Sequence, residues 1–121
     1  ELLTYLNDGM TEESPLVGPA YDSLDVDLAV HEGLAARIAD AITRATGLAP
    51  SSPRHPHWVG FQCGGVRPAV WMMRMMSAVN VSSRREGTVL FVPVNPVVDP
   101  EGEIVSSSVV LIHRLAKSRI G

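Results

Sequence analysis

Apolar residues recur at every third or fourth position between residues 26 and 46, which is the spacing of one face of an α-helix. Ser23 or Asp25 can cap the start of this helix, and Gly47 can end it in the left-handed conformation. The pattern therefore predicts a helix over residues 26–46. The positions that carry it are Leu28, Leu34, Ala35, Ile38, Ala41, Ile42 and Ala45.

Two short runs further along the chain are typical of β-strands. Residues 57–63 alternate in side-chain character, and residues 88–94 are apolar throughout, with residues 82–87 as a polar turn before them. Residues 66–81 are apolar nearly all round, and Pro68 suits the first turn of a helix. Strand, helix and strand in this order predict a βαβ unit with two parallel strands and a right-handed crossover.

Residues 104–120 fit two interpretations. Their apolar positions lie on one helical stripe, whereas the β-branched run at residues 109–112 favours a strand. The composition of residues 114–119, with Gly121 after them, favours the helix. Because two strands are too few for a stable sheet, we expect this segment or another subunit to complete it.

The predicted fold is a small α/β (or α+β) domain over residues 26–121, in the order helix, strand, helix, strand, helix. Residues 1–25 combine acids with glycine, proline and serine, which predicts an irregular acidic N-terminal arm lying over the surface. The whole chain of 121 residues is long enough to bury one core.

The net charge of −3 conceals a strong asymmetry. Residues 1–32 hold eight acids and no Lys or Arg, so their charge is −8, whereas residues 33–121, with ten bases and five acids, carry +5. We expect the arm, or the arm of a neighbouring molecule, to lie against the basic residues of the body. Those residues are Arg67, Arg74, Arg84 and Arg85.

Composition also bears on the partners and the cellular location that we expect for the protein. Overall acidity argues against a dedicated nucleic-acid binder, so we expect no nucleic-acid partner. No apolar run is long enough to span a bilayer, and residues 1–10 lack the basic start of a signal peptide, so we expect no membrane association. Cys63 is the single cysteine and can form no internal disulfide, which favours a cytoplasmic location.

The most suggestive motif spans the end of the first strand and the start of the helix after it. Cys63 would face the N-terminus of that helix, where free amides and the helix dipole favour an anion or a thiolate. Gly64 and Gly65 would let the backbone approach a ligand, and Arg67 would clamp it, with Arg74 two turns further on the same face. The pattern matches no nucleotide-binding loop. It predicts a pocket for a small anion.

A second interpretation places a catalytic site at the same strand-to-helix turn. Cys63 would act as nucleophile or acid, with His57 or His113 as base, in a small-molecule transferase, hydrolase or isomerase. The opposing interpretation is that Cys63 is a small buried apolar residue. His31, on the apolar stripe of residues 26–46, is expected to be a core or interface residue. The pair formed by His55 and His57 has no third ligand at zinc-like spacing, so we expect neither metal nor cofactor.

The predicted helix at residues 66–81 suggests a further role, because its all-round apolar character calls for burial on more than one side. Its cluster of Met72, Met73, Met75 and Met76 can adapt to a partner surface. The sequence therefore predicts an accessory or protein–protein interaction protein that works as a homo-oligomer or as a subunit of a larger assembly. The small-molecule enzyme is the alternative.

Overall fold

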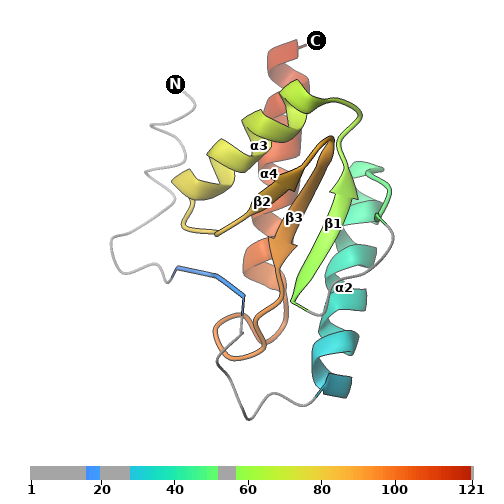
Figure 1. Ribbon diagram of the computed structural model, residues 1–121, viewed down its shortest axis with the longest axis vertical. Coiled ribbons are helices and arrows are strands. Elements are labelled where there is room, and N and C mark those ends of the chain that lie inside the picture. The colour runs from blue at the N-terminus through green and yellow to red at the C-terminus, as the bar shows by residue number, and fades with distance from the viewer. Residues whose placement is uncertain (1–15, 20–27, 52–56, 121) are drawn as a thin grey trace.

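The computed structural model describes residues 16–19, 28–51 and 57–120. This part of the chain forms three helices and one three-stranded sheet, which confirms the mixed α and β class (Figure 1). The C-terminal segment is a helix, as its composition favoured. The elements are α2 (Leu28–Thr46), β1 (Trp58–Gln62), α3 (Val66–Ala78), β2 (Arg84–Glu86), β3 (Val89–Pro93) and α4 (Glu103–Ile120).

The sheet has the order β1-β3-β2, and β3 is antiparallel to both neighbours. The predicted parallel pairing of the strands at 57–63 and 88–94 is therefore wrong. The reason is that residues 84–86, expected as part of a turn, form β2. A two-residue turn with Gly87 at φ 60° then reverses the chain into β3. The βαβ unit is β1-α3-β2, and its two strands run in the same direction with β3 between them.

One face of the sheet packs against the helices, and α4 lies between α2 and α3 (Figure 1). Alternate residues of β1 and β3 point into this layer, where they meet the apolar stripes of the three helices. None of the described helices is long and apolar enough to cross a bilayer. Among the fully buried large side chains are Phe61, Ile38, Ile42, Met76, Leu90, Ile112, Val17, Val81, Val92, Val94 and Val105.

Part of the N-terminal segment belongs to the core, contrary to the expected surface location. Val17 is completely buried, and its backbone pairs with Val81 in a parallel bridge. Its amide donates to the Asn80 carbonyl at 2.8 Å. The carbonyl of Gly18 accepts a hydrogen bond from the Asn95 side chain at 2.9 Å. Residues 1–15 and 20–25, which carry the acids of the predicted arm, lie outside the described residues.

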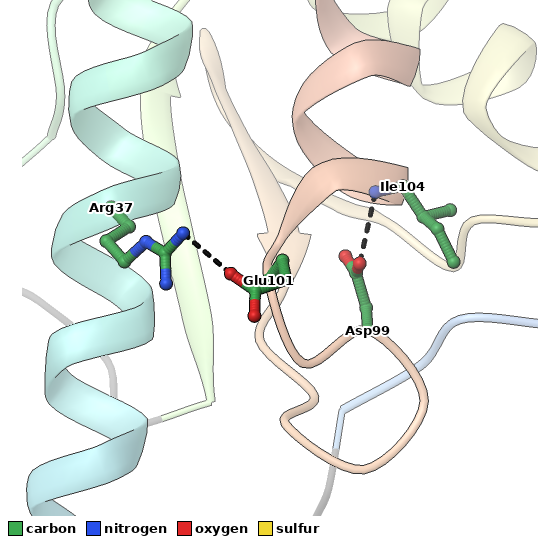
Figure 2. A network of polar contacts seen from close by, with 4 residues as sticks. All are labelled: Arg37, Asp99, Glu101 and Ile104. Atoms are coloured by element: carbon green, nitrogen blue, oxygen red, sulfur yellow. Dashed lines mark hydrogen bonds and ion pairs between the residues drawn. The ribbon is translucent and has the colours of Figure 1, made fainter.

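The loop before α4 is held by side chains that bind its backbone. The buried carboxylate of Asp99 accepts hydrogen bonds from the amides of Ile104, at 3.0 Å, and Val105, at 3.1 Å. These amides belong to the first turn of α4, where no helical partner exists for them. Nearby, Glu101 forms an exposed ion pair with Arg37 of α2 at 2.8 Å (Figure 2). Asp99 binds backbone amides and Glu101 binds Arg37, so the two carboxylates do not form a pair for general acid–base catalysis.

Candidate functional site

The predicted pocket for a small anion lies at the turn between β1 and α3. Gly64 has φ 82°, and its amide donates to the Gln62 side chain at 2.9 Å. Gly65 is the residue before the first turn of α3, and no side chain caps the helix there. One of the two predicted ligand-binding amides is therefore already occupied by a neighbouring side chain.

The thiol of Cys63 is half-buried against the hydrophobic core. Burial raises its pKa above the usual thiol value, and a backbone hydrogen bond at Leu90 opposes this only in part. Its sulfur lies 3.7 Å from the Phe61 carbonyl oxygen. These are the surroundings of a protonated thiol rather than of a thiolate.

The structure does not bring Cys63 together with either candidate base. The hydrogen bonds of Cys63 within the described chain go to backbone groups of its own and the neighbouring strand. His113 lies half-buried on α4, where burial and then the Lys117 charge lower its pKa. His57 precedes β1 and contacts a different histidine.

The environment of Cys63 predicts slow alkylation at neutral pH. Only the thiolate reacts, so its raised pKa should place the midpoint of the rate against pH above that of an unstructured peptide cysteine, about 8.5. Iodoacetamide labelling followed by mass spectrometry across pH measures this midpoint directly. Restricted access lowers the rate at every pH without moving the midpoint. A midpoint below that of the peptide would instead support the catalytic interpretation.

Arg67 and Arg74 lie on the outer face of α3, and both are exposed. The buried face of the helix carries Ala69, Met72, Met75 and Met76, so the helix is less uniformly buried than its composition suggested. Neither arginine forms an ion pair within residues 16–19, 28–51 and 57–120. Their spacing places two positive charges on one face of the helix, two turns apart, without an ion-pair partner among the described residues.

The other two arginines of the predicted basic surface are engaged locally. Arg84 pairs with Glu86 at 3.3 Å, and its guanidinium carbon lies 5.9 Å from the centre of a Trp58 ring. Arg85 donates to the Gly87 carbonyl at 2.9 Å. Because β2 holds these two side chains and α3 holds Arg67 and Arg74, the four do not act as one cluster along a single helix.

The ring of His57 contacts the ring of His31. His57 was a predicted site residue, whereas His31 was expected to be a core or interface residue. The two ring centroids are 5.1 Å apart and the rings are nearly perpendicular, at 81°. His31 is 3% exposed, and its Nε2 is buried without a hydrogen-bond partner. The Val94 carbonyl accepts a hydrogen bond from this ring, and the Val94 amide donates to the His57 carbonyl at 3.0 Å. Val94, the residue that follows β3, thus forms a hydrogen bond with each of the two histidines.

The imidazole of His31 is neutral near neutral pH. Burial lowers its pKa most, and the neighbouring His57 lowers it further. The Val94 carbonyl and the Glu32 carboxylate oppose this lowering. Since the ordinary histidine value is already about 6.5, the ring keeps one unprotonated nitrogen at pH 7. With Val94 accepting from the ring and Nε2 unpartnered, that nitrogen is Nε2.

A small cleft lies between α2 and β1, and neither His31 nor His57 lines it. Ala35, one turn after His31, lines it, and so does Trp58, the residue after His57. Its volume of about 20 Å³ admits little more than one water-sized group. The remaining lining residues are Ala39, Pro50, Ser51, Val59 and Gly60. The cleft is too small for an organic substrate.

No protein-family model, curated protein or solved structure matches this chain. Function must therefore be argued from the residues alone. Within the described part of the chain, no group of three or more His, Cys, Asp or Glu side chains could hold a metal ion. Sequence reasoning missed the histidine pair because 26 positions separate its members, and no local spacing connects a helical residue with a loop residue.

Proposed function

We propose that this protein is a small non-catalytic accessory domain of the cytoplasm that associates with a second copy of itself through the outer face of α3. The observation that carries this proposal is the exposed pair of Arg67 and Arg74, which have no carboxylate partner within the described residues. Val66, at the start of the same helix, is 51% exposed. Arginine beside apolar surface is characteristic of protein interfaces.

Charge complementarity supports a second copy as the partner. Residues 1–15 contain four acids and no base, so each molecule carries both the positive face of α3 and a negatively charged segment. The chain is thus able to complement itself without another protein. The raised pKa of Cys63, and the lack of a hydrogen bond between that thiol and a histidine among the described residues, add support for a role without catalysis.

Self-association is expected to depend on the two arginines of α3. The double variant Arg67→Gln and Arg74→Gln should weaken the dimer roughly tenfold or more, because truncating a central interface arginine commonly costs more than about 1 kcal/mol. Light scattering over a micromolar concentration series, at low and high salt, measures the dissociation constant. High salt should also weaken the wild-type dimer, since exposed charges are screened.

The matched control is the double variant Arg37→Gln and Arg44→Gln. These two arginines have the same seven-residue spacing on α2 and are also exposed, but each already pairs with an acid, Glu101 or Asp40. This control should dimerise like the wild type. A wild-type protein that stays monomeric throughout the concentration series contradicts the proposal, as does equal weakening in both double variants.

A further inference from the structure

The unpartnered nitrogen of His31 is the least explained polar atom in the described core. Its Nε2 is buried without a hydrogen bond, on a side chain that is only 3% exposed. A buried polar atom without a partner destabilises the folded state, so its retention calls for an explanation. The ring's hydrogen bond to the Val94 carbonyl leaves Nε2 as the nitrogen with the free lone pair.

This arrangement has the features of a metal-ligating histidine. Such a histidine almost always donates its other ring N–H to a carboxylate or backbone carbonyl, which fixes the ring and the tautomer. Here the Val94 carbonyl takes that role. A second imidazole, that of His57, lies beside the first, with a centroid separation of 5.1 Å. Val94 thus bonds the His31 ring through its carbonyl and the His57 backbone through its amide.

We propose that His31 and His57 form a binding site for one divalent transition-metal ion of the zinc type. Imidazole nitrogen is a preferred ligand of zinc, nickel and copper ions. No third protein ligand is present within the described residues, so water fills the remaining coordination positions. The site is independent of the α3 face and of self-association.

The test is a titration of the 121-residue chain, freed of metal with a chelator, with zinc chloride alone. Isothermal titration calorimetry should show one equivalent bound with micromolar affinity, weaker than four-ligand structural sites. Cobalt(II) substitution gives an absorption spectrum that reports the number of coordinating groups. In nuclear magnetic resonance spectra of the imidazoles, zinc should shift the signals of His31 and His57 and leave those of His113 unchanged.

Three variants make the result specific. His57→Ala and His31→Asn should each lower zinc affinity roughly tenfold or more, whereas His113→Ala, a half-buried histidine on α4, should leave it unchanged. Should His31→Asn fail to fold, the wild-type His31 signal still decides. The proposal is overturned when the wild type binds no zinc, or when binding persists in His57→Ala. Binding through His55 and His57 that leaves the His31 signal unmoved also overturns it.

Discussion

Replacing Gly102 with alanine is expected to destabilise the protein by about 2–5 kcal/mol, a large part of the stability of a domain of this size. Gly102 is buried, and its φ of 70° lies in the left-handed region, which costs an alanine about 1–2 kcal/mol. An added Cβ would also lie 2.5 Å from the Ile38 Cγ1 atom and 3.1 Å from a Leu34 methyl carbon. Overpacking of this kind adds about 1–3 kcal/mol.

Gly47→Ala separates the two contributions. Gly47, which follows α2, has a φ of 78°, but no atom lies within 4 Å of an added Cβ. It should therefore show the backbone cost alone, about 1–2 kcal/mol. Urea unfolding of both variants and the wild type measures the difference. Equal losses would show that α2 moves away from residue 102 without cost, which would contradict the close packing of that helix against the loop before α4.

Asp99→Ala is the second substitution with a large expected effect, about 2–4 kcal/mol. It removes the carboxylate that binds the amides of Ile104 and Val105 (Figure 2 shows the first of these bonds). Loss of a helix cap alone costs about 0.5–2 kcal/mol. Val105 is completely buried, so its amide would lose its partner without gaining water. Chemical denaturation measures the loss, and amide hydrogen exchange should show faster opening of the first turn of α4.

Glu101→Gln is the control for Asp99→Ala. Glu101 lies two residues away in the same loop, but its ion pair with Arg37 is exposed, with side chains 59% and 62% accessible. Surface pairs of this kind contribute about 0–1 kcal/mol. The two acids of one loop should thus differ several-fold in their effect on stability. A comparable loss in both variants would indicate that net charge, rather than the cap, stabilises the start of α4.

The helices were predictable because their apolar residues repeat over many turns. The helix expected at 26–46 is found at 28–46, and the one expected at 66–81 is found at 66–78. Strands β1 and β3 were predictable from their β-favouring side chains. β2 was not, because a three-residue edge strand of Arg84, Arg85 and Glu86 has no apolar alternation to reveal it. Missing this strand led directly to the wrong pairing of β1 with β3.

In the candidate sites, too, features set by local spacing could be predicted from the sequence, and contacts between distant segments could not. That Arg67 and Arg74 share one helix face follows from their spacing, and both are exposed there. The contact of His31 with His57 depends on how α2 packs beside β1, which no local pattern encodes. Burial of Val17 was equally hidden, since a single valine among prolines and glycines looks like any loop residue.

The docking of the N-terminal segment constrains the order in which the fold is completed. Gly18 is made before any element of the sheet, yet the side chain that binds its carbonyl belongs to Asn95, 77 residues later. During synthesis, the segment that contains Val17 therefore emerges without its partners, because Val81 follows α3 and Asn95 follows β3. Closing so long a loop slows folding. This segment is thus translated before the residues that bind it, and it takes its final position only after they have been made.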